Sequence, residues 1–125
     1  MRSARSRVAQ VFRVLGDDTR LQILALLGVR EACVCELVEV LALSQPAVSE
    51  HLRRLRDVGL VEDERRGVWV FYRRAAELPD FAAAAMRAME VPADLVARLD
   101  ATTAAGACVR TASGAGARSA LGAIR

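Results

Sequence analysis

The stretch LSQPAVSEHLRRLRDVGLV, from Leu43 to Val61, carries the strongest folding signal in the sequence. Ser44 is a favourable helix N-cap, and Pro46 is tolerated in a first turn because its missing N–H would have no partner there. Apolar residues follow at the i, i+4, i+7 spacing of one helix face: Val48, Leu52 and Leu55. This pattern predicts a helix over residues 44–58 that ends at Gly59.

Three further helices are expected before this one. The first covers residues 5–15 and has an amphipathic pattern, with these residues on one face: Val8, Val11, Phe12 and Leu15. The second is capped by Asp17 and ended by Gly28, and the third lies near residues 34–42. Because the third helix and the helix over 44–58 are joined by a short turn, they predict a helix-turn-helix.

The run LVEDERRGVWVFYRR, from Leu60 to Arg74, predicts a β-hairpin, because two β-rich segments flank Arg66-Gly67. Its tip carries Arg65 and Arg66. A hairpin that follows a helix-turn-helix is a wing. The expected fold is therefore mainly α with a small β-hairpin wing, a winged helix-turn-helix.

The C-terminal part is expected to be less regular. A helix is predicted near residues 78–90, and Pro92 opens another short one. Its apolar anchors are Leu95, Val96 and Leu99. The remaining sequence is mostly Ala, Gly, Ser and Thr, which bury little large apolar surface. We therefore expect a folded DNA-binding and dimerisation domain over residues 1–100 and a mobile tail over 101–125 that carries Cys108.

Composition limits the classes of function. The chain has 125 residues, a net charge of +3, a pI of about 9.2 and 18 basic residues, all of them arginine. No apolar run approaches the roughly 20 residues of a membrane helix, and no signal peptide is apparent, so we expect a cytoplasmic protein. The single histidine and the lack of a Gly-rich phosphate loop argue against an enzyme and against an organic cofactor.

The helix over 44–58 has a polar face opposite its apolar stripe, as a helix in a DNA major groove requires. Gln45 and Ser49 are placed to read base edges, and Glu50 could accept from a cytosine amino group. The arginines of the helix and wing are better suited to phosphates. The candidate DNA-binding residues are Ser44, Gln45, Ser49, Glu50, Arg53, Arg54, Arg65 and Arg66. The alternative is a solvated charged helix. His51 lies beside the apolar stripe, so it is interpreted as packed or hydrogen-bonded.

Several segments together resemble the ArsR/SmtB family of bacterial winged-helix repressors. They are LGDDTRLQILALL, CVCEL, LSQPAVSEHLRRLRDVGLV and RRGVWVFYR, and the resemblance covers roughly residues 8 to 90. It implies a homodimer formed through the first and last core helices, which binds double-stranded operator DNA until an inducer releases it. Members with Cys-Val-Cys at this helix start are typically arsenite and antimonite sensors, so the resemblance implies metalloid binding by Cys33 and Cys35.

The two thiols present a geometric conflict. At the start of a helix both should have a lowered pKa, because backbone N–H groups and the helix dipole favour thiolates. Residues i and i+2 point about 200° apart on an ideal helix, so one ion could be held only if the first turn unwinds. Such a distortion would disturb the recognition helix that packs on it. The alternative for the pair is simple buried packing.

At the third ligand the chain departs from the family pattern, because arsenite sensors of this type often have another cysteine where this chain has Val38. The only remaining thiol is Cys108, which could complete a three-sulfur site or be an idle tail residue. The family's zinc sensors carry histidines on the last dimer helix, which has none here. Cadmium or lead remains an alternative inducer, and so does a thiol-redox or persulfide response that pairs Cys33 with Cys108.

Overall fold

The computed structural model describes residues 3–113. Its helices are α1 (Ala4–Leu15), α2 (Asp18–Val29), α3 (Val34–Leu41), α4 (Gln45–Asp57), α5 (Asp80–Ala88), α6 (Ala93–Asp100) and α7 (Ala104–Ser113). Its strands are β1 (Ala32–Cys33), β2 (Val61–Arg66) and β3 (Trp69–Arg74). They form one antiparallel sheet in the order β1-β3-β2. The predicted class, mainly α with a β-hairpin wing, is confirmed.

The ends of the helices are fixed by the capping side chains and the glycine that the sequence predicted. The Asp17 carboxylate accepts the Arg20 N–H at 3.0 Å to cap α2, and the Ser44 hydroxyl accepts the Ala47 N–H at 3.3 Å to cap α4. The turn after α4 places Gly59 at φ +80°, a left-handed conformation that glycine adopts without strain.

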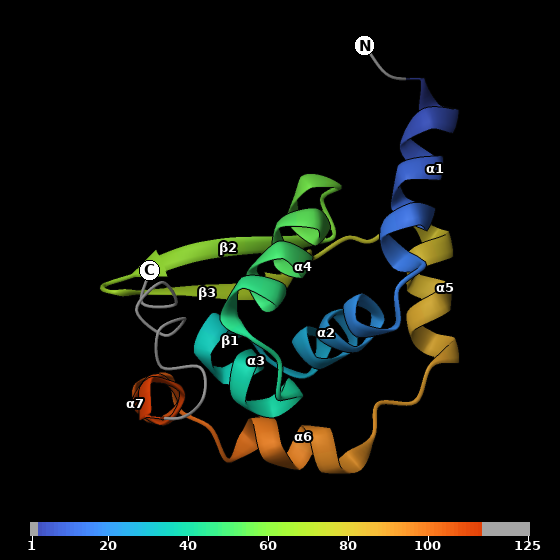
Figure 1. Ribbon diagram of the computed structural model, residues 1–125. Helices are drawn as coiled ribbons and strands as arrows, with labels where there is room; N and C mark the ends of the chain where they lie inside the picture. The colour runs from blue at the N-terminus through green and yellow to red at the C-terminus, as the bar shows by residue number, and fades with distance from the viewer. Residues whose placement is uncertain (1–2, 114–125) are drawn as a thin grey trace.

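The elements are arranged around one core (Figure 1). The hairpin of β2 and β3 projects to one side of the helices, while α1 and α5 stand together on the other, and α6 runs along α3. The largest fully buried apolar side chains include Ile23, Leu24, Leu26, Leu37, Leu52, Leu55, Leu60 and Leu99. The helices α2, α3, α4 and α6 all contribute to this cluster, so α4 and the thiol-bearing helix α3 share one core.

The C-terminal prediction is wrong over part of its length. Where the sequence predicted a mobile tail from residue 101, the structure has α7, which packs against α3. Alanine is the best helix former, and its small side chain allows the two helices to approach closely. Ala107 is fully buried, and the Thr103 hydroxyl accepts the Gly106 N–H at 3.1 Å to fix the first turn. Residues 114–125 of the predicted tail lie outside the described residues.

The strand β1 was not predicted. It has only two residues, and its partner β3 is far away in sequence, so no local periodicity marks it. It joins Ala32 to Tyr72 and Cys33 to Phe71, and therefore attaches the start of α3 to the wing.

The anchoring of α4 can be tested by Leu52→Ala. Leu52 is completely buried in the core cluster, so its truncation should lower the free energy of unfolding by about 2–5 kcal/mol. Chemical denaturation followed by circular dichroism measures the change. Arg54→Ala, on the exposed face of the same helix, is the matched control and should stay within about 0.5 kcal/mol of the wild type. Equal losses would contradict the assigned packing.

Candidate functional site

The β1–α3 junction places the first two thiols. Cys33 has extended backbone angles, φ −89° and ψ 166°, and is the N-cap of α3 rather than part of it, whereas Cys35 lies in the first turn. The side chains consequently do not point apart as two residues inside an ideal helix would. The pKa values of the two thiols shift in opposite directions, which indicates a hydrogen bond from Cys35 to Cys33. The predicted conflict assumed that both residues lie inside the helix, whereas Cys33 lies immediately before it.

The third thiol comes from α7. The Cys108 sulfur lies 2.8 Å from the Cys35 sulfur, in a contact that is buried from solvent. All three cysteines are free thiols, with Cys35 in contact with both others. The structure thus brings together the three predicted ligands, while Val38 points into the core as an apolar residue.

The thiols differ in their acidity. The hydrogen bond from Cys35 lowers the pKa of Cys33 below its ordinary value of 9.0; burial opposes this shift and the Glu36 backbone N–H assists it. The pKa of Cys35 is raised, because it donates to Cys33, is buried and contacts Cys108. The prediction that both pKa values are lowered is therefore confirmed for Cys33 and wrong for Cys35. Cys33 is the site of the first thiolate.

The cluster is a set of candidate ligands rather than a finished coordination site. Over residues 3–113, no three His, Cys, Asp or Glu side chains already stand in an arrangement that could hold a metal ion. The donor set is nevertheless suited to a soft element, since three sulfurs, one each from β1, α3 and α7, lie within one buried cluster. Binding must replace the hydrogen bonds between the thiols and shift their side chains.

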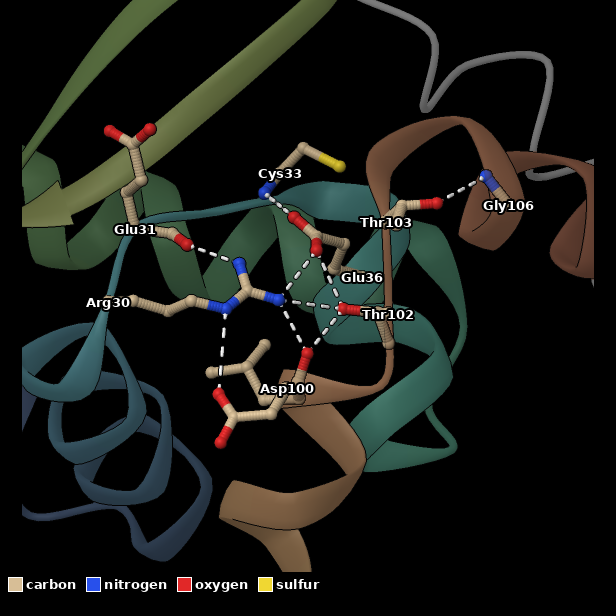
Figure 2. Close-up of polar contacts among 9 residues, drawn as sticks. Arg30, Glu31, Cys33, Glu36, Asp100, Thr102, Thr103 and Gly106 are labelled. Carbon is tan, nitrogen blue, oxygen red and sulfur yellow. Dashed lines mark hydrogen bonds and ion pairs between the residues drawn. The ribbon is translucent and has the colours of Figure 1, made fainter.

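A buried carboxylate beside the thiols was missed by the sequence interpretation. Glu36 is only 2% exposed, and its oxygens accept from the Cys33 N–H at 3.0 Å, the Thr102 hydroxyl at 2.6 Å and the Arg30 guanidinium at 2.8 Å (Figure 2). Burial alone would raise the pKa of Glu36, but the hydrogen bonds from Arg30, Thr102 and Cys33 outweigh it and hold the pKa below 4.5. The signal in the sequence was an acidic residue at the third position of a helix, which is typical of a capping box.

The thiol segment is also linked to the wing. Cys33 pairs with Phe71 of β3, and the Arg66 guanidinium lies 4.8 Å from the centre of the Phe71 ring. Arg66 also forms an ion pair with Glu31, immediately before β1, and a second with Glu64 at 2.9 Å. These contacts keep the pKa of Arg66 raised. A movement of β1 would therefore reach a predicted DNA-contacting arginine directly.

The predicted DNA-reading residues of α4 are engaged with one another. The Gln45 amide donates to the Ser49 hydroxyl at 2.5 Å, while Ser44 caps the helix. Glu50 accepts from Arg53 and lies 3.1 Å from Arg54, so the carboxylate orients both guanidinium groups. The pKa of Glu50 is lowered by its hydrogen bond from Arg53.

A groove separates α4 from the wing. It has a volume of about 410 Å³, and its lining includes Ser49, Arg53, Arg56, Arg65 and Tyr72. Three predicted DNA-contacting residues, one of them on the hairpin, thus face the same open space. His51 lies behind this surface and accepts from Arg20 at 3.3 Å, as its hydrogen-bonded interpretation requires.

Comparison with known proteins decides the family. Residues 17–63, which contain the thiol pair and the whole of α4, match the model described as "Bacterial regulatory protein, arsR family". HlyU from Vibrio cholerae has a similar structure, with a TM-score of 0.59 and 32% identity over 70% of this chain and 91% of that one. The chain belongs to the ArsR family of bacterial regulatory proteins.

Several relatives with curated names are arsenic or cadmium resistance regulators. The arsenic resistance transcriptional regulator ArsR1 of Pseudomonas putida is 45% identical, over 62% of this chain and 61% of its own. The arsenical resistance operon repressor of Escherichia coli is 47% identical, over 59% and 64%. The cadmium resistance protein CadC homolog of Staphylococcus aureus is 38% identical, over 52% and 54%. The chain therefore spans less than two thirds of the length of these relatives. The relatives are regulators of transcription and not enzymes.

The order of thiol ionisation is open to a direct test. Carbon-13 labelling of the cysteine β-carbons should show Cys33 titrating below pH 9.0 and Cys35 above it. Cys35→Ala removes the donor and should raise the pKa of Cys33. Cys108→Ala should lower the pKa of Cys35 and leave Cys33 nearly unchanged. A Cys33 resonance that ignores Cys35→Ala would contradict the hydrogen-bonded pair.

Proposed function

We propose that this ArsR-family protein is a dimeric repressor that binds double-stranded operator DNA and is released when trivalent arsenic or antimony is bound by Cys33, Cys35 and Cys108. The observation that carries the proposal is the buried contact between Cys35 and Cys108, beside Cys33 at the start of α3. It gives the thiol pair a third sulfur from the same chain.

The donor set supports a metalloid as inducer. Trivalent arsenic and antimony take three sulfurs, whereas zinc prefers four ligands and usually includes histidine or carboxylate. With arsenite as As(OH)₃, three thiol protons leave with three hydroxyl groups as three water molecules, and three As–S bonds form. The names of the relatives from Pseudomonas putida and Escherichia coli support the same inducer. Cadmium remains the alternative that the Staphylococcus aureus relative suggests.

Two physical connections join the thiols to the DNA-binding surface. The helix α3 packs against the recognition helix α4, so a shift of Cys35 acts on α4 through their shared core. The strand β1 pairs with β3, so a shift of Cys33 acts on the wing. The inducer and the operator then stabilise different arrangements of the same elements, and each weakens binding of the other.

Dimerisation is supported by the face that α1 and α5 share. Phe12 stacks on Phe81 with ring centres 4.7 Å apart, yet Phe12 remains 56% exposed and Val8 is 40% exposed. A partner subunit would cover these apolar side chains. Two α4 helices could then enter successive major grooves of a palindromic operator. Within residues 3–113 no helix is long and apolar enough to cross a membrane. As an operator-binding repressor, the protein would act in the cytoplasm.

A thiol-redox response is the second candidate, because the same sulfurs are already in contact. With hydrogen peroxide as oxidant, two thiols would lose their protons and two electrons to form a disulfide and two water molecules. The sequence interpretation paired Cys33 with Cys108, but the close contact in the structure joins the sulfurs of Cys35 and Cys108 and favours that pair. Operator release by peroxide in the absence of any metalloid would favour this candidate.

The inducer is tested by operator binding. Fluorescence anisotropy with the DNA upstream of the protein's own gene, under reducing conditions, should show arsenite releasing the wild type. Cys108→Ser should bind DNA equally well but need about tenfold or more arsenite, because it loses one of three ligands. Equal release of both proteins would remove Cys108 from the site. No release of either would reject arsenite and direct the same titration to cadmium and then to peroxide.

The wing contact is tested by Arg65→Ala. Arg65 is an exposed cation in the groove beside α4, so its loss should weaken binding to all DNA sequences alike and lower the slope of log K against log salt by about one. Arg98→Ala, on α6 and outside the groove, removes the same charge as a control. Identical effects of the two substitutions would assign the change to net charge alone.

A further inference from the structure

The strongest feature that the proposed function does not use is the carboxylate of Glu36. It lies in the first turn of α3, and each of its oxygens reaches a different part of the thiol site (Figure 2). Oε1 accepts the N–H of Cys33, which carries the first thiol. Oε2 accepts the Thr102 hydroxyl, which lies between α6 and the helix that carries Cys108.

Thr102 joins the start of α7 to α3, because it contacts Glu36 of α3 and lies two residues before α7. Its hydroxyl oxygen lies 2.6 Å from the Glu36 carboxylate and 2.7 Å from the Leu99 carbonyl oxygen, so the two acceptors share its hydrogen, and it accepts from Arg30 at 3.0 Å. Thr102 is only 6% exposed. The helix α7 starts two residues later, and Cys108 lies about one helical turn into it. Because a short helix is stiff over one turn, a fixed Thr102 fixes the height and rotation at which Cys108 meets Cys35.

Arg30 completes the arrangement and keeps the carboxylate ionised. Its guanidinium donates to Glu36, to the Thr102 hydroxyl and to the carbonyl oxygen of Leu99 at 2.5 Å, and it lies 3.9 Å from Asp100. A buried ion pair is rarely more stabilising than apolar packing of equal volume. The ion pair instead fixes the orientation of the side chains, since each donor has to lie near a lone pair of its acceptor.

We propose that Glu36 is the positioning residue of the thiol site, holding Cys33 and Cys108 in register through its two oxygens, and that Thr102 is the connection through which it places Cys108. This inference rests on the proposed three-thiol function and adds residues that do not themselves bind the inducer. Loss of the Thr102 connection should detach Cys108 from the site while Cys33 and Cys35 remain. The packing of α3 on α4, and therefore operator binding, should be unaffected.

Thr102→Val and Thr102→Ser form the matched pair for the test. Valine keeps the shape of threonine and removes only the hydroxyl, whereas serine keeps the hydroxyl and removes a methyl group. Arg30 and the Cys33 N–H still satisfy Glu36 in both variants. Each full-length protein, with and without arsenite, is alkylated with N-ethylmaleimide in native buffer and analysed by mass spectrometry to find which cysteines arsenite protects. Operator affinity without arsenite is measured in parallel.

In the wild type and Thr102→Ser, arsenite should protect all three cysteines. In Thr102→Val, it should protect Cys33 and Cys35 only, and arsenite affinity should fall about tenfold or more, as for other partners that orient ligands. Unchanged operator affinity in the absence of arsenite would show that the fold is intact. If Thr102→Val does not fold, Glu36→Gln replaces it, since the amide can accept from only one of the two sides.

The outcomes separate the two proposals. Full protection of Cys108 in Thr102→Val, at wild-type arsenite affinity, overturns the positioning role of Glu36 and Thr102 and leaves the three-thiol site standing. An unprotected Cys108 in the wild type overturns both. Protection of Cys108 that is lost in Thr102→Val and regained in Thr102→Ser supports both, because a purely structural role would lower stability without selecting one thiol.

Discussion

The structure depends most on the short junction between β1 and α3, where one buried residue takes part in three sets of contacts. The backbone of Cys33 belongs to the wing sheet, its N–H is accepted by Glu36, and its sulfur accepts from Cys35. A buried N–H or thiol cannot lose its partner without a cost in free energy. The junction therefore cannot move alone: a change at the sulfur has to be shared with the sheet, with α3 or with the C-terminal helix. A displacement of the two-residue strand β1 therefore affects several other elements of the fold.

The DNA-facing surface is held by a different balance of forces. Its arginines are paired with carboxylates of the same chain, as Arg53 is with Glu50 and Asp57, and Arg66 is with Glu31 and Glu64. These pairs are exposed, and exposed ion pairs contribute little free energy, so a phosphate can replace the carboxylate at small cost. Glu50 forms ion pairs with both Arg53 and Arg54, so in the proposed function it would hold two guanidinium groups in place before DNA binds.

Sequence reasoning succeeded where the determining interactions are local and failed where they are not. The caps at Asp17 and Ser44, the apolar stripe of α4 and the glycine at its end all depend on residues within one or two turns, and each lies where it was predicted. The strand β1 depends on a partner about 40 residues away, and α7 depends on the surface of α3. The alanine-rich composition of α7 predicted a mobile tail, because each alanine side chain buries little apolar surface. Composition does not reveal that small side chains also allow two helices to pack closely. The same limit hid the role of Glu36, whose partners Arg30 and Thr102 cannot be found by spacing.

Charge gives a physical reason why the proposed inducer is trivalent. The thiol cluster is buried and lies against the carboxylate of Glu36, whose charge is already balanced by Arg30. Three thiolates bound to a divalent cation such as cadmium or lead would leave one uncompensated negative charge there, and burying such a charge is costly. Three thiolates bound to trivalent arsenic or antimony form a neutral unit, which replaces three protons without changing the charge of the site. In this interpretation burial selects the inducer: sulfur favours soft elements in general, and the closed, carboxylate-lined setting favours the trivalent ones among them.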